Sequence, residues 1–450
     1  MPGWRRPGTS YERSQEIKRR MRTRFAWIAV LALVSLGFVM ACSTKYSSSS
    51  NGLVVVPSRD SKVMQTFSLN LGNGHVSQIN NASGPTTPGL PSSVVLDPAG
   101  AFAYLLVTLD PTLPAGPGNL TGIATFQIAS DGKLSAAATT ALSNAILTIG
   151  STCESVPVTP VALAMDSAGK FLFVANSATA DATGNPVPGS VSVFAIGSNA
   201  ALVEVSPVSC TSPNTPGSPF PLPVQTGGST PSASALALTP TVFPAHFAPC
   251  SGQTAPATQN LYVADSVDNV VVNYLVSSTG SLTLVPTVAV PTGTLPSGVA
   301  VDPCNRFVYV ANTNTNNVSA YTICSVVSPT CPQADYSLQL VAGSPYSVGD
   351  HPGPIAVDAY ANFLYVVDTG SSQISAFRIG SASGSLTPLS TVATNSGPNS
   401  IAIRSDDSWL FVANSNSANV SEYAITPAAG TLTPVSPFTT LSYPSGVAVK

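Results

Sequence analysis

One unit recurs along this chain: an aromatic and β-branched run, a short polar loop and a second run of the same kind. In Phe307–Ile323 the runs are FVYVA and VSAYTI, and the loop between them is almost entirely Asn and Thr. Aromatic and β-branched residues favour strands, and Asn tolerates the left-handed backbone of a tight turn. The unit therefore predicts a β-hairpin. Further copies begin at Phe171, Asn260, Phe363 and Trp409.

The spacing of the copies predicts the architecture. Tyr262 and Tyr309 are 47 residues apart, and Tyr365 and Phe411 are 46 residues apart. A repeat of this length is typical of one four-stranded blade of a β-propeller. We therefore expect an all-β fold, a seven-bladed β-propeller of four-stranded blades. The seven runs that fit a second strand are Leu53–Val56, Phe102–Val107, Phe171–Ala175, Leu261–Ala264, Phe307–Ala311, Phe363–Val367 and Trp409–Ala413.

The two ends of the repeat region complement each other. Gly52–Ile79 contains the second, third and fourth strands of a blade without a first strand. Pro444–Val449 has the pattern of a first, innermost strand, with no other strand after it. We therefore expect the C-terminal strand to complete the N-terminal blade, which closes the ring and leaves no exposed sheet edge. The predicted propeller domain is 52–450.

An aromatic-Val-Ala-Asn/Asp string lies at the centre of each copy. It is present in Phe173–Asn176, Tyr262–Asp265, Tyr309–Asn312 and Phe411–Asn414, and Tyr365–Asp368 departs from it slightly. These strings resemble the motif of YVTN-type β-propeller repeat proteins, which are related to the lactonase-like seven-bladed propellers. The resemblance implies the fold but no single function, because one fold can support many activities. In lactonase-like propellers the proposed chemistry uses Arg, His and Glu at the central tunnel. Here Ser-Ser, Ser-Gly, Gly-Pro and Asn-Ser follow the inner-strand prolines, so the resemblance carries no catalytic set to this chain.

Residues 1–41 have the layout of a signal peptide. Eight of the 17 basic residues precede Phe25, and the apolar run FAWIAVLALVSLGFVMA follows them. The run ends at Val39-Met40-Ala41-Cys42, which resembles a bacterial lipobox, in which the Cys is lipidated and becomes the first mature residue. Residues 42–51 then form a Ser-rich tether. The alternative is an uncleaved transmembrane helix, since a run of 17 residues is at the lower limit for crossing a bilayer. We expect a lipoprotein anchored in a membrane at the cell envelope, on its periplasmic or surface face.

The charge of the chain argues against nucleic acid as a partner. The whole sequence has a formal net charge of −3, but from Ser43 onward 9 Lys and Arg accompany 18 Asp and Glu. The predicted mature protein is therefore acidic and has no basic stripe for a phosphate backbone. Charged residues form only 8% of the chain, so Ser, Thr, Asn, Gly and Pro supply its polarity, as expected of an exported protein.

Six cysteines remain once Cys42 is lipidated, and an even number in an exported chain indicates disulfides. Zinc is the competing interpretation, but the chain has no CxxC pair, and His75 and His351 lie far from every Cys in sequence, although His246 lies four residues before Cys250. In a propeller, loops between first and second strands share a face with loops between third and fourth strands. The pairs consistent with this arrangement are Cys250 with Cys304, Cys324 with Cys331, and Cys153 with Cys210.

The sequence contains no GxSxG, HExxH, CxxCH or phosphate-binding Gly loop. We therefore predict no catalytic set, no cofactor and no metal site. His351 is the one catalytic candidate, because HPGP places it just before an inner strand, near the tunnel mouth; the alternative is a loop His bonded to backbone or water. Asp265, Asp268 and Asp368 could bind Ca²⁺, but Asp is also common in tight turns, and we favour the turn.

Three functions remain under consideration. The favoured hypothesis is a non-catalytic binding or interaction module whose partner is an unknown glycan, peptide or envelope protein, with the chain a monomer. The alternative is a lactonase-like hydrolase of sugar lactones, related to 6-phosphogluconolactonases. A quinone-dependent dehydrogenase is disfavoured, because only Trp409 among the three Trp lies in the repeats. Side chains that face the tunnel would distinguish the first two hypotheses.

Overall fold

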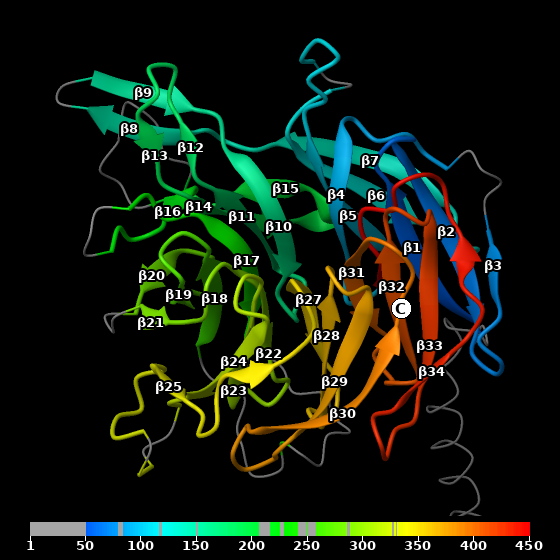
Figure 1. Cartoon of the computed structure of the whole chain (residues 1–450). Coiled ribbons are helices and arrows are strands. Elements are labelled where there is room, and N and C mark those ends of the chain that lie inside the picture. Colours follow the sequence, from blue (N-terminus) through cyan, green and yellow to red (C-terminus); the bar gives the residue numbers. More distant parts are fainter. Residues whose placement is uncertain are drawn as a thin grey trace, which may run out of the picture. The chain divides into compact units, whose positions relative to one another are not determined.

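The computed structural model describes residues 51–79, 84–116, 119–149, 152–206, 217–225, 229–241, 250, 258–285, 289–325, 328–329 and 331–450. Within it, Gly52–Lys450 forms one compact unit of antiparallel sheets arranged as blades (Figure 1). The predicted signal peptide, Cys42, Cys210 and His246 lie outside the described residues. No helix of the described part is long and apolar enough to cross a membrane.

Seven sheets form the blades, which we number along the chain from the N-terminal one. Their strands are given from the innermost outward. Blade 1 is β36 (Ala448–Val449), β1 (Asn51–Ser58), β2 (Val63–Asn70) and β3 (Val76–Gln78). Blade 2 is β4 (Leu90–Leu96), β5 (Phe102–Thr108), β6 (Gly122–Ile128) and β7 (Leu134–Ala141). Blade 3 is β10 (Thr159–Met165), β11 (Phe171–Ser177), β14 (Ser190–Ile196) and β15 (Leu202–Glu204).

The other four blades follow the same order. Blade 4 is β17 (Ala233–Leu238), β18 (Gln259–Asp265), β19 (Val270–Val276) and β20 (Leu282–Leu284). Blade 5 is β22 (Pro296–Val301), β23 (Phe307–Asn312), β24 (Asn317–Ile323) and β25 (Leu338–Leu340). Blade 6 is β27 (Pro352–Val357), β28 (Phe363–Asp368), β29 (Gln373–Ile379) and β30 (Leu386–Ala393). Blade 7 is β31 (Pro398–Ile403), β32 (Trp409–Asn414), β33 (Asn419–Ile425) and β34 (Leu432–Pro434).

Short elements complete the sheets. Two-residue strands pair with the third strands of blades 3, 4, 5 and 7: β16 (Phe220–Pro221), β21 (Val290–Pro291), β26 (Tyr346–Ser347) and β35 (Phe438–Thr439). Two extra hairpins, which contribute to one apolar cluster, are β8 (Ala145–Ile149) with β9 (Thr152–Val156) and β12 (Thr179–Ala180) with β13 (Pro186–Val187). A short 3₁₀ turn, η1, spans Ser198–Ala200.

The C-terminal strand closes the ring, as predicted. β36 pairs with β1, with Val54 opposite Val449 and Val55 opposite Ala448. Two backbone hydrogen bonds join Leu53 and Lys450, at 3.0 and 2.9 Å. Each inner strand contacts the inner strand of the next blade, in an unbroken cycle that returns to β4 through β36. Figure 1 shows the first and last segments of the described chain side by side.

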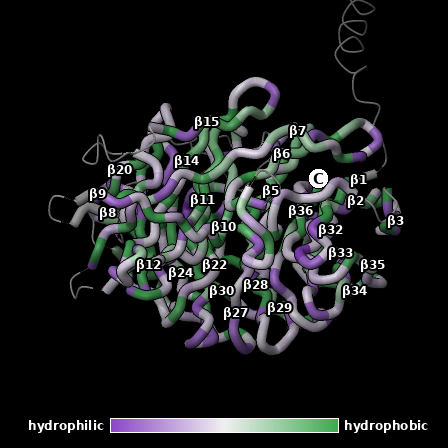
Figure 2. The backbone as a smooth tube through the Cα atoms, turned by 90° about the horizontal axis from the view of Figure 1, so that it is seen from above, coloured by the Kyte–Doolittle hydropathy of each residue, from purple (hydrophilic) through white to green (hydrophobic). Residues whose placement is uncertain are grey.

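The interfaces between blades form the core, and hydrophobic residues are accordingly spread through all the sheets (Figure 2). Tyr309 and Tyr365, the aromatic residues of the recurring string, are fully buried. Their hydroxyls donate to the carbonyls of Gly384 and Gly430 in the next blade, at 3.1 and 3.0 Å. A Cβ on Gly384, whose φ is +69°, would lie 2.4 Å from Phe307. Glycine is therefore required there both by the left-handed backbone and by the close approach of the neighbouring blade.

Antiparallel strands place the loops on two faces. Loops between second and third strands emerge on one face, together with the segments that lead into the inner strands, such as 349–351. We call this the mouth face. The other loops emerge on the opposite face, which carries two disulfides, Cys250–Cys304 and Cys324–Cys331. These are two of the expected pairs, whereas the pairing of Cys153 with Cys210 lies outside the described residues.

Candidate functional site

Four consecutive blades have a left-handed residue immediately before the inner strand. These residues are Leu295 (φ 57°), His351 (φ 52°), Gly397 (φ 73°) and Tyr443 (φ 54°), in blades 5, 6, 7 and 1. Each carbonyl accepts an N–H from the adjoining loop between second and third strands; the donors, in the same order, are Thr313 (2.9 Å), Thr369 (3.0 Å), Ser415 (2.7 Å) and Arg59 (2.9 Å). The shared bond makes the four positions structurally equivalent on the mouth face. A left-handed backbone costs a non-glycine residue about 1–2 kcal/mol, so these residues are held there by their surroundings.

His351 is exposed on the mouth face, where the sequence placed it. Its N–H donates to Asn316 Oδ1 at 2.9 Å, and its carbonyl also accepts the Thr369 hydroxyl at 2.6 Å. Asn316 Nδ2 in turn donates to Asp350 Oδ1 at 3.1 Å. A Cβ on Gly370 would lie 2.7 Å from His351 Nδ1, so the next loop leaves room for the imidazole only because residue 370 is glycine. The backbone of His351 is thus fixed while its ring faces solvent.

Arg59 departs from the repeat at the equivalent position of blade 1. In blades 4 to 7 the first residue of the loop between second and third strands carries a hydroxyl: Ser266, Thr313, Thr369 and Ser415. Three of these hydroxyls donate to the carbonyl of the residue that precedes the inner strand. The Arg59 side chain instead lies over the Tyr443 ring, with its guanidinium carbon 5.5 Å from the ring centre. Arg59 is exposed and Tyr443 is half-buried.

The residues that follow the inner-strand prolines have a structural role. In each of blades 2 to 7 the register with the second strand shifts at this point, as in a β-bulge. Bulges redirect a side chain away from the ladder. Ser234 Oγ donates to the carbonyl of Pro296 at 2.6 Å, and Ser297 Oγ to that of Pro352 at 3.0 Å. Asn399 Nδ2 donates to the carbonyl of residue 444 at 3.0 Å. These polar side chains therefore join each inner strand to the next one.

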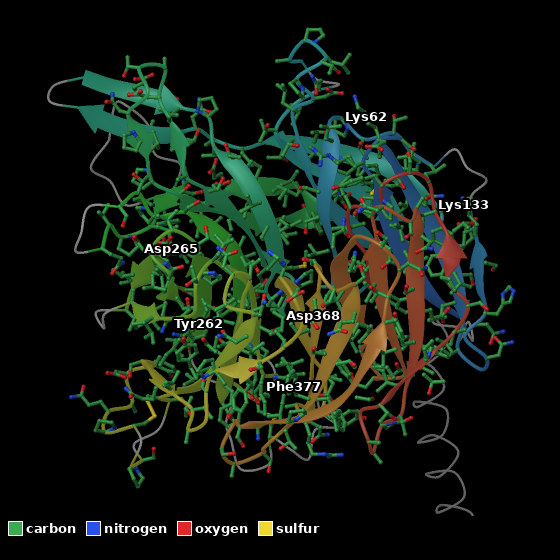
Figure 3. The ribbon with its side chains drawn as sticks, viewed as in Figure 1. Lys62, Lys133, Tyr262, Asp265, Asp368 and Phe377 are labelled. Carbon is green, nitrogen blue, oxygen red and sulfur yellow. A yellow bond between two sulfur atoms is a disulfide. The ribbon has the colours of Figure 1, made fainter. Side chains whose placement is uncertain are left out.

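The described cations are divided unequally between the two faces. Lys62 (Figure 3) and Arg59 belong to the loop between β1 and β2, which emerges on the mouth face. Lys62 is paired with Asp110, and this hydrogen bond and ion pair lower the pKa of the Asp110 carboxyl to about 2. The other described Lys and Arg side chains lie in loops or strand ends of the opposite face: Lys133, Lys170, Arg306, Arg378, Arg404 and Lys450. Within the described residues, no carboxylate forms an ion pair with Arg59.

Two of the three Asp residues considered for Ca²⁺ are buried hydrogen-bond acceptors, and the third, Asp268, accepts the Ser229 hydroxyl. Asp265 is fully buried, and its Oδ1 accepts N–H groups of Ser232, Val267 and Asp268. Asp368 Oδ2 accepts the Ser375 hydroxyl at 2.6 Å. Burial raises the pKa of both Asp265 and Asp368. They come from different blades (Figure 3), and the described residues contain no group of three or more His, Cys, Asp or Glu that could hold a metal ion.

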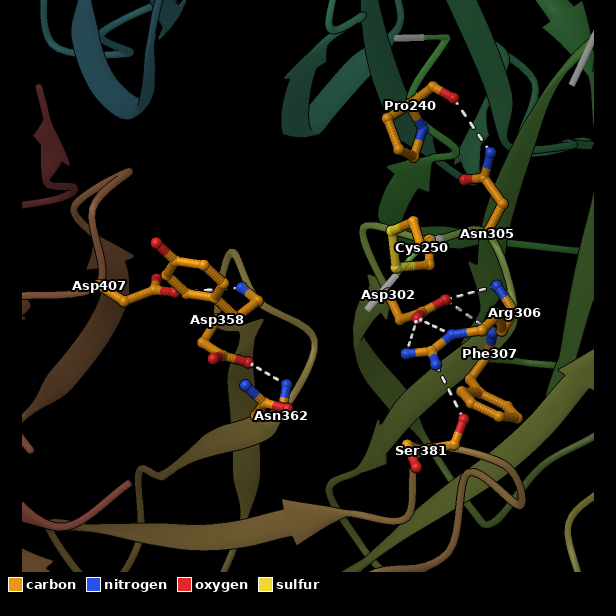
Figure 4. Close-up of a disulfide and its surroundings, with 12 residues drawn as sticks. Pro240, Cys250, Asp302, Asn305, Arg306, Phe307, Asp358, Asn362, Ser381 and Asp407 are labelled. Carbon is orange, nitrogen blue, oxygen red and sulfur yellow. Dashed lines mark hydrogen bonds and ion pairs between the residues drawn. A yellow bond between two sulfur atoms is a disulfide. The ribbon is translucent and has the colours of Figure 1, made fainter. Parts of the chain in front are cut away.

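On the opposite face, charged side chains form hydrogen bonds that hold the loops in place. Arg306 Nε donates to Asp302 Oδ2 at 2.8 Å, beside the Cys250–Cys304 disulfide (Figure 4). Asp407 accepts the N–H groups of residues 359 and 360 in the neighbouring blade. Burial, with the Asp407 charge as a lesser cause, raises the pKa of Asp358 to about 7. Arg306, in the loop between β22 and β23, and Arg378, near the end of β29, therefore lie away from His351.

A family model described as "Lactonase, 7-bladed beta-propeller" matches residues 226–326 and 336–450, which is just under half of the chain and covers blades 4 to 7. The chain is related to the lactonase-like seven-bladed propellers. This confirms the resemblance drawn from the recurring strings. No curated protein sequence matches this chain.

Solved structures share the seven-bladed fold of this chain at low sequence identity. The periplasmic gluconolactonase of Pseudomonas aeruginosa has a TM-score of 0.64 and 16% identity, with 89% of this chain and 99% of that chain covered. A candidate 6-phosphogluconolactonase of Bacteroides fragilis has a TM-score of 0.61 and 16% identity, with 90% and 99% covered. A Lactobacillus plantarum protein has a TM-score of 0.62 and 15% identity, with 89% and 99% covered. At these identities the likeness shows the fold.

The family match corrects the favoured hypothesis of a non-catalytic binding module. That hypothesis relied on the Ser, Gly, Pro and Asn residues that follow the inner-strand prolines. Several of these side chains join neighbouring blades, so their identity does not decide whether the mouth face carries chemistry. The left-handed residues and the adjoining loops provide other positions, and His351 and Arg59 occupy two of them.

Proposed function

We propose that the protein is a lactonase-like hydrolase that opens sugar lactones. The observation that carries the proposal is the match of blades 4 to 7 to the lactonase family model. The position of His351 supports it. Of the three His, His75 lies in the loop between β2 and β3 on the opposite face, and His246 lies outside the described residues. His351 is thus the described imidazole of the mouth face.

In the proposed reaction, water attacks the lactone carbonyl carbon and the acyl C–O bond of the ring breaks. His351 takes a proton from the attacking water, and the ring oxygen receives a proton as it leaves as a hydroxyl. An imidazole suits this task because its ordinary pKa lies near neutral pH. The His351 N–H donates to Asn316 Oδ1 and its carbonyl accepts the Thr369 hydroxyl, so the backbone that carries the imidazole is held in place.

The test is the hydrolysis of glucono-1,5-lactone and of its 6-phosphate, measured against the spontaneous rate in the same buffer. We expect His351→Ala to lower kcat/KM by about 10²-fold or more, the usual contribution of general acid–base catalysis. His75→Ala is the matched control, since it removes an exposed His from the opposite face. A wild-type rate no higher than the spontaneous rate for both lactones would refute the proposal.

A further inference from the structure

The structure points to a second functional element on the mouth face, which rests on the proposed function for its choice of ligand. We propose that Arg59 binds the carboxyl end of the sugar acid and that Tyr443 is the positioning residue that holds Arg59 there. The ligand class is an aldonate, the ring-opened product, whose carboxylate derives from the lactone carbonyl. The proposal concerns recognition, so it can be measured without turnover.

The repeat provides the first argument. At the position of Arg59, four other blades carry a small hydroxyl residue, and three of those hydroxyls bond to a carbonyl of their own mouth segment. Arginine cannot reproduce that short bond, yet the backbone bond to the carbonyl of Tyr443 is kept at 2.9 Å. The exchange therefore leaves the architecture intact and adds a planar cation with five donors to the mouth face.

The second argument is that Arg59 and His351 lie at neighbouring parts of the mouth face, because the repeat places Tyr443 and His351 at equivalent positions. Tyr443 and His351 occupy the same position of the repeat, in blades 1 and 6, and only blade 7 separates them. The inner strands of these three blades are in contact in turn. At Gly397, the equivalent position of blade 7, a Cβ would lie 2.7 Å from the Asn416 side chain, so the adjoining loop takes that space. Imidazole, amide and guanidinium groups thus follow one another along one arc of the mouth.

Charge provides the third argument. The chain after Ser43 has twice as many acidic as basic residues, and of the described cations only Arg59 and Lys62 belong to the mouth face. The Lys62 ammonium forms an ion pair with the Asp110 carboxylate. The neighbouring Asp60 is exposed, but it forms no ion pair with Arg59 in the described structure. For an anion that approaches this face, Arg59 is the cation that remains open to a bidentate contact.

The contact with Tyr443 explains how Arg59 is oriented. A guanidinium stacked over an aromatic ring loses part of its freedom before a ligand arrives. The Tyr443 carbonyl accepts the Arg59 N–H, and the hydroxyl of the preceding residue, Ser442, lies 3.4 Å from Ser61 Oγ in the Arg59 loop. The ring, not the hydroxyl, does the positioning, so phenylalanine should replace tyrosine without loss.

The experiment is equilibrium binding of sodium D-gluconate to the full folded domain, by calorimetry or ligand-observed NMR, together with the KM and kcat for glucono-1,5-lactone. We expect Arg59→Ala to weaken gluconate binding about tenfold or more, as for the loss of a charge-assisted hydrogen bond. Arg59→Lys should recover part of the affinity, because it keeps the charge and loses the planar fork. Tyr443→Leu should weaken binding by about two- to fivefold, and Tyr443→Phe should match the wild type. Lys133→Ala, an exposed cation of the opposite face, is the control.

The outcomes separate this inference from the proposed function. If lactone hydrolysis depends on His351 but gluconate binding and KM are unchanged in Arg59→Ala, the inference is wrong and the function stands. If the wild type binds gluconate through Arg59 without hydrolysing lactones, the inference stands and the function falls. Gluconate binding that is lost equally in Tyr443→Phe and Tyr443→Leu would overturn the positioning role. Thermal melting of each variant shows that the fold is kept.

Discussion

Glu422→Gln is expected to remove a pH dependence of folding that the wild type carries at the seam where the ring closes. Glu422 lies on β33, opposite Phe411 on β32, and its side chain is only 2% exposed. Phe411 belongs to the apolar cluster between blades 7 and 1, where Phe438 contacts both Phe411 and Phe67. Glu422 Oε1 has no hydrogen-bond partner among the described residues. A carboxyl group in such surroundings resists ionisation.

The size of the effect follows from the pKa. Burial raises the pKa of Glu422 from 4.5 to about 8. At a pH between these two values, the Glu422 carboxyl is ionised in the unfolded chain but keeps its proton in the folded protein. The contribution to stability is therefore full below pH 4.5 and is lost progressively as the pH rises toward 8. Since one pKa unit corresponds to about 1.4 kcal/mol, the loss has a ceiling of about 5 kcal/mol over the whole interval.

The assay is urea denaturation of wild type and Glu422→Gln at several pH values from about 5 to 8. Because other buried carboxyls such as Asp358 also titrate, the informative quantity is the difference between the two proteins. The difference in unfolding free energy should grow as the pH rises, and the variant should become the more stable of the two proteins. Glu422→Ala is a second test, since Ala320 and Ala376 occupy the corresponding positions of blades 5 and 6. Parallel stability curves for the wild type and both variants would refute the reasoning.

Three further predictions concern the ends and cross-links of the chain. Deleting 444–450 should abolish cooperative thermal unfolding, because blade 1 loses its inner strand and two sheet edges open; an unchanged melting temperature would exclude a structural role for the closure. Cys42→Ser should move the protein from the membrane to the soluble fraction, and a variant that stays in the membrane would indicate a transmembrane helix. Non-reducing peptide mapping should link Cys153 to Cys210, a bond expected to add about 2–4 kcal/mol; a link between Cys153 and Cys324 would contradict this layout.

His351 shows how far sequence reasoning reached at the site, and Arg59 shows where it stopped. The HPGP segment was enough to place His351 before an inner strand, because a proline that begins a strand is a local signal. Arg59 was missed, although aligning Ser58-Arg59 with Asn312-Thr313 would have shown a cation where the repeat has a hydroxyl. Its stacking on Tyr443 joins residues 384 positions apart in the chain, so no local pattern contains it.

The sequence alone predicted the hairpin repeat, the seven blades and the closing strand, because each blade is a local unit whose strands, turns and glycines are contiguous in the chain. It also determined that the chain resembles lactonase-like propellers. Which polar groups join the blades and which face solvent became clear from the folded ring. Ser297 and Asn399 bond to the next blade, whereas His351 and Arg59 remain exposed on one face. That division depends on contacts between blades that are distant in the sequence and on left-handed residues at the junctions of the blades.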